Sequence, residues 1–395
     1  MNQKLYFNLS CIALLLLWIM VSCTKDNLSS LYPDAKNDDD TNLPPTVLPP
    51  SGKNLVFDET MLTRFLSDYD AGGEARQFIT NNITNPATLA LSVTPTPVKY
   101  LRNADNSENH EAEVNAEAAR VYVLSLQWLL EKHRESGDAD LYLQKAKSFL
   151  LAWAATNRAT DFMPGEVAYL PFIYAYSIIS EELTTEERTT IENWLKERYD
   201  TQYRPFTPRA NNWETCRMNL IFDIAYATQD QQMLEYAKQS YITLLNNNIM
   251  ADGASEDLLD RDAYAYHTYN LYFYAKIFRS VTVMEGIEAG DAFKAQTNTN
   301  GSDVRSMVMR VKPYMDDPIT NVHVEFVNTG YAPDKLRSDY NKPFAPSSAM
   351  YVMNQLVFSY PAEVMSTIKI YQSNVTPFNR NLNFYLFTLG LSRPL

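Results

Sequence analysis

Segments with the apolar spacing of an amphipathic α-helix run through most of this chain, and they constrain its fold more than any other feature. We predict helices at residues 58–69, 116–135, 139–156, 169–179, 185–199, 213–227, 231–248 and 263–283. Short polar turns such as "ESGDAD" and "ATQDQQ" join consecutive segments, so we expect antiparallel hairpins packed side by side. The predicted fold is mainly α, an incomplete (α/α)n toroid or barrel of antiparallel helix hairpins.

One segment departs from the helical spacing. Residues 319–327, "ITNVHVEFV", alternate in polarity and are rich in β-branched side chains, which predicts a strand or hairpin. We therefore expect a small β-hairpin or long loop near residues 319–345, and long loops inside compact domains are often functional. In a strand, His323 and Glu325 would share one face, either at a site or as a surface ion pair.

The N-terminus resembles a bacterial export signal. It has a basic Lys4, an apolar run from Ile12 to Val21, and Ser22 directly before Cys23, as in a lipobox. The run is short for a membrane span, although an uncleaved anchor is the alternative. We predict a lipoprotein signal peptide at 1–22 and lipidation of Cys23.

The next segment, 23–53, is acidic and proline-punctuated, without helical or strand spacing, and we predict a flexible tether. Residues 54–395 then form the folded domain. We expect an exported, lipid-anchored monomer on the periplasmic or cell-surface face of the outer membrane. After signal removal, Cys23 would be lipidated and Cys216 would be the remaining thiol, so no intramolecular disulfide is possible.

The formal net charge of −13 argues against nucleic acid as a partner. An anionic ligand would have to meet a local basic cleft, which an acidic exterior permits because exposed charges are screened beyond about 8 Å at physiological salt.

Two consecutive asparagines open the predicted helix at 213–227, in "NNWETCR". One of Asn211 and Asn212 can be its N-cap, with Trp213 in the core. The alternative is an amide donor beside an aromatic platform for a sugar.

A tyrosine-rich stretch, "RDAYAYHTYNLYFYAKIF", begins at Arg261. Tyr266 and His267 can be core residues, with Leu271 and Phe278 on the buried face seven residues apart. However, Arg261 lies five residues before Tyr266, and a cation beside a phenol favours the phenolate that can act as a base.

These motifs resemble the alginate lyase superfamily of helical-toroid polysaccharide lyases. "DLLDRDAYAYHTYNL" is similar to its Arg-Asp-Ala-x-x-Tyr-His signature, and "NNWETCR" to its Asn-Asn-aromatic helix start. A helix pair ending in Ala-Trp, within "YVLSLQWLLEKHRESGDADLYLQKAKSFLLAWA", and "NVHVEFVN" follow the family order. The matches span about residues 116 to 330.

The resemblance implies β-elimination on an anionic uronic-acid polysaccharide, alginate or glucuronan, without a metal or cofactor. Tyr266 falls on the family's catalytic tyrosine, Arg261 on its arginine and Asn212 on the asparagine that binds the substrate carboxylate. The residues that we further expect to take part are His267 in catalysis and Asn211, Trp213, Arg217 and His323 in substrate binding.

The sequence departs from the family at the histidine position. Trp213 stands where some members have histidine, and Cys216 where others do. His267 and His323 are the candidates to replace that imidazole. Two other functions stay open: a glycoside hydrolase using carboxyls of "EDLLDRD", and a glycan-binding lipoprotein without activity.

Overall fold

The structure is a computed structural model that describes residues 48–50, 52–102, 108–160, 162–371 and 381–390. These residues form helices and loops, with no β-strand among them. The predicted signal peptide, Cys23 and most of the predicted tether lie outside the described residues. In the described part, every helix is too short or too polar to span a bilayer.

Four helix pairs build the body of the domain. The pairs are α5 (Glu111–His133) with α6 (Ala139–Thr156), α8 (Leu170–Ile179) with α9 (Thr185–Arg198), α10 (Asn212–Ala227) with α11 (Gln231–Asn248), and α13 (Tyr264–Glu285) with α14 (Ile287–Lys294). They confirm the predicted helices to within a few residues at either end. Thr184 and Glu187 form a reciprocal capping box at the start of α9, as its sequence indicates.

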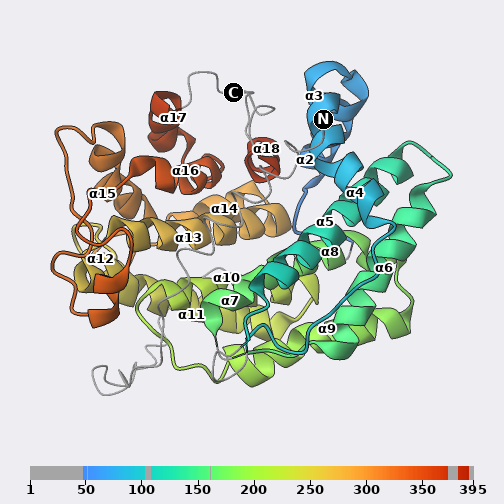
Figure 1. The fold of residues 1–395 in the computed structure, drawn as a ribbon, viewed down its shortest axis with the longest axis horizontal. Coiled ribbons are helices and arrows are strands. Elements are labelled where there is room, and N and C mark those ends of the chain that lie inside the picture. Colours follow the sequence, from blue (N-terminus) through green and yellow to red (C-terminus); the bar gives the residue numbers. More distant parts are fainter. Residues whose placement is uncertain (1–47, 51, 103–107, 161, 372–380, 391–395) are drawn as a thin grey trace.

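The pairs follow one another around an incomplete ring, which confirms the predicted α/α toroid (Figure 1). Helices α5, α8, α10 and α13 contact each other in this order, while α6 packs on α5 and α9, and α11 packs on α10. Nearly every residue of α10 is buried, because neighbours surround this helix on all sides.

Shorter helices at both ends of the chain extend the ring. They are α2 (Glu59–Ala71), α3 (Gly73–Ile79), α4 (Asn85–Ala90), α15 (Val304–Asp316), α16 (Met350–Leu356), α17 (Pro361–Tyr371) and α18 (Leu382–Thr388). Figure 1 shows α18 beside α2. The ring centroids of Phe65 and Tyr385 are 6.4 Å apart, and the Tyr385 hydroxyl donates to Asp68 at 2.9 Å. These contacts join the two ends of the described domain.

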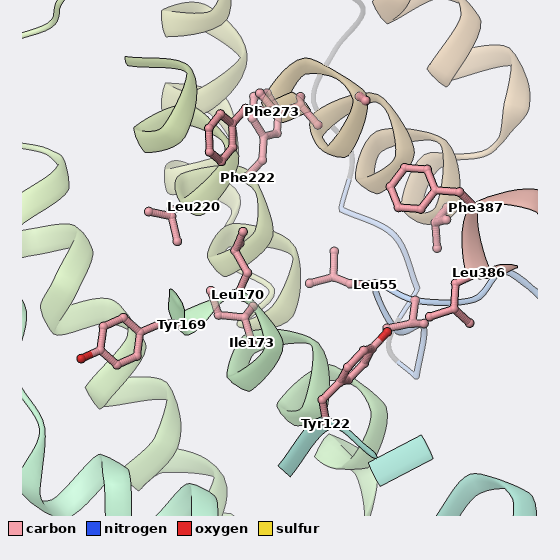
Figure 2. Packing of buried hydrophobic residues seen from close by; sticks show 14 of the residues in the cluster. Leu55, Tyr122, Tyr169, Leu170, Ile173, Leu220, Phe222, Phe273, Leu386 and Phe387 are labelled. Carbon is pink, nitrogen blue, oxygen red and sulfur yellow. The ribbon is translucent and has the colours of Figure 1, made fainter. Parts of the chain in front are cut away.

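A single large apolar core lies between the helices. Figure 2 shows part of it, where Leu170 and Ile173 of α8 lie near Leu220 of α10 and Leu55 of the N-terminal segment. The predicted core positions Leu271 and Phe278 are confirmed, since both are fully buried.

A buried ion pair lies inside this largely apolar region. Arg198 of α9 contacts Glu166 of α7 (Met163–Glu166) at 3.2 Å, and neither side chain is exposed. Glu166 also accepts from the hydroxyl of Tyr203 at 2.8 Å. The Arg198 guanidinium lies 3.8 Å from the ring centroid of Tyr169. Such a pair is tolerated in the core because its opposite charges compensate each other and the Glu166 carboxylate accepts further hydrogen bonds.

The strand predicted at 319–327 is wrong, and the alternative of a long loop near 319–345 is confirmed. The loop carries one isolated antiparallel bridge, between Val324 and Pro343. Glu325 is buried, and its carboxylate accepts the backbone N–H groups of Tyr264 at 3.0 Å and Ala265 at 3.3 Å. Glu325 therefore caps the N-terminus of α13, and the predicted surface ion pair with His323 is also wrong.

Candidate active site

The junction between α12 (Glu256–Arg261) and α13 positions the first two site residues. Asp262 adopts the left-handed conformation with φ of 51°, which aspartate tolerates better than most residues. This residue separates two helices, whereas the sequence predicted only the second of them, at 263–283. Arg261 thus ends one helix and Tyr266 lies in the first turns of the next.

The phenol of Tyr266 lies between two guanidinium groups. Its hydroxyl oxygen is 3.2 Å from Nη2 of Arg261 and 3.2 Å from Nη1 of Arg337. Phe326 meets the ring edge-on at 5.9 Å, and Tyr266 as a whole is 3% exposed. Two donated N–H groups at one oxygen favour the phenolate over the phenol.

Each guanidinium is held in place by a carboxylate of the long loop. Asp334 accepts from Nε of Arg261 at 2.6 Å and also from its Nη2, and it receives the Thr329 hydroxyl at 2.6 Å. Asp339 accepts from Nε and Nη2 of Arg337, both at 2.8 Å. Bidentate pairs of this kind fix the plane and direction of the guanidinium.

Sequence reasoning missed Arg337. It lies 71 residues after Tyr266, in a loop segment without periodicity. The one available signal is its position in "KLRSDY", where an arginine precedes an aspartate by two residues inside a long polar loop.

The loop is attached to the helix junction through Asp262. The backbone oxygen of Asp262 accepts the N–H of Phe326 at 2.8 Å and lies 3.0 Å from Nε2 of His323. Its carboxylate accepts the N–H of Asn328 at 2.8 Å. The structure thus places His323 at the junction, partly exposed, with its ring edge-on to Tyr264 at 4.9 Å.

The two asparagines at the start of α10 have different roles. Asn211 is the N-cap, and its side chain accepts the N–H of Trp213 at 3.2 Å. Asn212 is 4% exposed, yet its side-chain amide forms no hydrogen bond with the described residues. The capping interpretation therefore belongs to Asn211, and the amide of Asn212 keeps its capacity for a ligand.

A buried hydrogen-bond network connects Asn212 with Tyr266. Oδ2 of Asp257 accepts the backbone N–H of Asn212 at 2.8 Å and Nδ2 of Asn270 at 2.7 Å. Nδ2 of Asn270 also lies 3.1 Å from the backbone oxygen of Tyr266. The starts of α10 and α13 are thereby held next to each other.

Burial raises the pKa of Asp257 to about 7, although the hydrogen bonds from Asn270 and Asn212 lower it. The carboxyl is 2% exposed. Asp257 therefore serves the network and does not face a glycosidic bond, as one of the two carboxyls of a glycoside hydrolase would.

The structure contradicts the catalytic role predicted for His267. The residue is fully buried, with Nδ1 3.0 Å from the Ser255 hydroxyl and Nε2 2.9 Å from the backbone oxygen of Met307. Burial lowers its pKa to about 4. With both nitrogens engaged, His267 is a core histidine, and of the two candidates for the missing imidazole only His323 lies at the site.

Arg217 and Trp213 were predicted to bind substrate, but their side chains are engaged elsewhere. Arg217 is fully buried and forms a bidentate pair with Glu214, at 2.9 and 2.5 Å. Trp213 packs edge-on to Phe162 at 5.8 Å, with the Arg209 guanidinium 4.4 Å from its ring centroid. Both side chains therefore stabilise the first turns of α10 and do not bind substrate.

Among the described residues, no group of three or more His, Cys, Asp or Glu side chains is placed to hold a metal ion. Cys216, at the family's alternative histidine position, is buried and forms a hydrogen bond with Tyr269. The site therefore consists of a phenol, two guanidiniums, an amide and a nearby imidazole.

Comparisons with known proteins identify the family and the fold. A family model described as "Alginate lyase" matches residues 74–320. A crystal structure of an alginate lyase from Bacteroides ovatus superimposes with a TM-score of 0.62 at 14% identity, covering 84% of this chain and 98% of that one. A histidine-to-alanine variant of alginate lyase A1-III complexed with a tetrasaccharide gives a TM-score of 0.53 at 13% identity, covering 78% of this chain and 88% of that one. No curated protein matches the chain.

The buried cap of α13 should make stability depend on pH. Burial raises the pKa of Glu325 to about 8, from 4.5 in an unfolded chain. Between these values the folded protein holds a proton that the unfolded chain has released, so stability falls as pH rises through this range. Glu325→Gln should reduce the slope of unfolding free energy against pH, by up to about 1.4 kcal/mol per pH unit.

Urea unfolding at pH 5, 6, 7 and 8 measures this slope. Glu288→Gln, at an exposed position in the first turn of α14, is the control for losing a carboxylate at a helix start. Parallel curves for wild type and Glu325→Gln would contradict the prediction.

Proposed function

The chain belongs to the alginate lyase family of polysaccharide lyases, and from this premise we propose that it cleaves alginate by β-elimination with Tyr266 as the proton-transferring group. The observation that carries the proposal is the Tyr266 hydroxyl oxygen, which lies 3.2 Å from the guanidinium groups of both Arg261 and Arg337. This arrangement favours a phenolate, and a phenolate is the base that the reaction needs.

The chemistry sets three requirements. The substrate carboxylate must be neutralised so that the proton on C5 becomes acidic, a base must remove that proton, and an acid must protonate the leaving O4. The Tyr266 phenolate takes the C5 proton, the C4–C5 double bond forms as the C4–O4 bond breaks, and the resulting phenol returns a proton to O4. One tyrosine can do both when the proton and the leaving oxygen lie on the same face of the sugar.

Arg261 and Arg337 stabilise the phenolate because their guanidinium groups are already oriented toward it. Because Asp334 and Asp339 fix both guanidiniums, their N–H groups point at the phenol oxygen before substrate arrives. Preorganised donors of this kind need no reorientation during the reaction. Arg337 thereby joins the set proposed from the sequence.

Asn212 is the proposed donor to the substrate carboxylate. Its amide makes no hydrogen bond with the described residues, and the Asp257–Asn270 network places its helix start beside that of Tyr266. His323 is the remaining candidate for an imidazole contact, since it lies partly exposed at the same junction.

Neighbouring structures support an oligosaccharide substrate. Histidine and tyrosine variants of alginate lyase A1-III, which share this fold, are complexed with a tetrasaccharide. We extend that ligand class to this chain as part of the proposal.

Tyr266→Phe removes one oxygen and keeps the ring that packs against Phe326. We expect the rate of elimination to fall by about 10²–10⁴-fold, the loss typical of a positioned acid or base. The measurement is near-ultraviolet absorbance of the unsaturated product on alginate, with glucuronan as the second polymer. Circular dichroism checks folding. A folded Tyr266→Phe protein with full activity would refute the mechanism, and binding of alginate without turnover by the wild type would identify a glycan-binding protein instead.

Asn212→Ala should lower transition-state stabilisation by about 2–4 kcal/mol, the range found for one lost oxyanion donor. The matched control is its neighbour, Asn211→Ala, which removes the helix cap and should cost about 1 kcal/mol of folding stability. Steady-state kinetics and thermal unfolding of both variants separate the two roles. Normal kinetics in Asn212→Ala, or a loss of turnover in Asn211→Ala alone, would reverse the assignment.

We also propose that Cys23 is lipidated and that the segment up to residue 53 tethers the domain to the outer membrane. The support is the lipobox-like sequence Val21-Ser22-Cys23 and the acidic, proline-rich segment after it. Mass spectrometry of the native N-terminus should show a diacylated or triacylated Cys23. An intact Met1, or cleavage at another residue, would exclude this anchor.

A further inference from the structure

A small cavity with both polar and apolar walls lies away from Tyr266, between helices α5, α8, α13, α16 and α18. Its volume is about 30 Å³, enough for about two water molecules or one carboxylate group. The polar residues that line it are Tyr122, Tyr174, Lys276, Arg279, Ser280, Gln355 and Asn383. Figure 2 shows the hydroxyl of Tyr122 directed toward Leu386, an apolar residue of the same wall.

Two cations in this wall have no carboxylate partner. Among the six buried lysines and arginines of the described residues, five form an ion pair within 4 Å and Arg279 does not. Its guanidinium donates instead to the backbone oxygens of Leu55 and Val56. The partly buried Lys276, three residues earlier, likewise makes no ion pair with the described residues.

Two tyrosine rings lie next to the ammonium group of Lys276. Its ammonium lies 4.9 Å from the ring centroid of Tyr272 and 5.7 Å from that of Tyr174. Asp223 is the buried carboxyl of this region, and it accepts hydrogen bonds from Tyr174, Asn219 and Ser280 without coming within ion-pair distance of either cation. Asp223 still interacts electrostatically with both cations, and Asp58 more weakly with Arg279, so the positive charge of this wall is partly compensated without an ion pair.

The cavity also holds a buried acceptor without a donor. Gln355 is 4% exposed, and its Oε1 has no hydrogen-bond partner among the described residues. An amide can turn to present its NH₂ group, so Gln355 can donate to an anion here. Unpaired buried charges and unsatisfied buried amides are costly, and both costs disappear when a hydrogen-bonding anion enters.

We propose that this cavity binds the carboxylate of a uronate unit that lies away from the bond being cleaved. The inference rests on the proposed function for its ligand class. Lys276 follows Tyr266 by ten residues in α13, which is about 15 Å along the helix axis. The cavity is therefore a separate site, which either a distant unit of the same chain or a free uronate can occupy. Asn383, which is exposed, marks the side of the cavity that reaches solvent.

Lys276→Met tests the proposal in the full chain, because methionine keeps much of the packing and removes the charge. Titration calorimetry of alginate oligomers in a Tyr266→Phe background, and thermal shift with a free hexuronate, measure binding at the cavity. We expect Lys276→Met to weaken binding by at least about 10-fold. Lys276→Arg should restore most of it. If Lys276→Met weakens binding of the free hexuronate, the cavity is an independent binding site. If it weakens binding of long oligomers alone, the cavity binds a distant unit of the polysaccharide chain that also occupies the active site.

The matched control is Lys294→Met, which removes a lysine that also lies over a tyrosine ring but is paired with Asp291. Equal affinities in Lys276→Met and Lys294→Met would overturn the proposal. If Lys276→Met does not fold, Gln355→Leu serves as the second variant under the same criteria. Because the free hexuronate cannot be cleaved, its result is independent of lyase activity. If the wild type cleaves alginate but Lys276→Met binds uronates as tightly as the wild type does, the proposed cavity site is rejected and the proposed lyase function stands.

Discussion

The active site depends on the attachment of one long loop to the junction of α12 and α13. Asp262 makes the attachment possible, because its left-handed conformation turns its backbone oxygen toward Phe326 and His323. The loop in return supplies Glu325 to cap α13, Asp334 to hold Arg261, and Arg337 to complete the phenol site. A substitution that releases the loop would therefore remove a helix cap and a guanidinium together, so stability and catalysis are coupled at this point.

The sequence predicted the helices well because their signal is local. Apolar periodicity and caps such as Thr184 depend on residues a few positions apart, and these define the ring of hairpins. The proximity of Arg261 and Tyr266 could also be predicted, because they are five residues apart in the sequence. The contact between Arg337 and Tyr266 could not, because it depends on the path of an irregular loop and joins residues 71 positions apart. The strand prediction at 319–327 failed for a related reason, since Glu325 binds the N-terminus of α13 instead of joining a ladder.

Hydrogen-bond satisfaction separates structural from functional polar groups better than residue type or burial does, since Asn212 is buried more deeply than Asn211. Asn211 and Asn212 are identical in chemistry and adjacent in sequence, but one amide caps the helix and the other has no partner among the described residues. The sequence predicted a catalytic role for His267 and substrate binding for Arg217, yet the hydrogen-bonding groups of both are engaged within the core. Asn212, Lys276 and Gln355 are among the described residues with unused hydrogen-bonding or charge-pairing capacity, and a ligand can satisfy that capacity.

Charge balance gives a reason why the proposed mechanism assigns the substrate carboxylate to an amide. Arg261 and Arg337 are each paired with an aspartate, so the group of four is close to neutral before Tyr266 is considered. Ionising the phenol makes the cluster negative, and a uronate carboxylate adds a further negative charge beside it. The guanidiniums, already directed at the phenol oxygen, cannot fully serve both anions. In the proposed mechanism, a neutral donor such as Asn212 stabilises the substrate carboxylate without drawing the arginines away from the phenolate, so that an acidic protein can act on a polyanion through a few fixed hydrogen bonds.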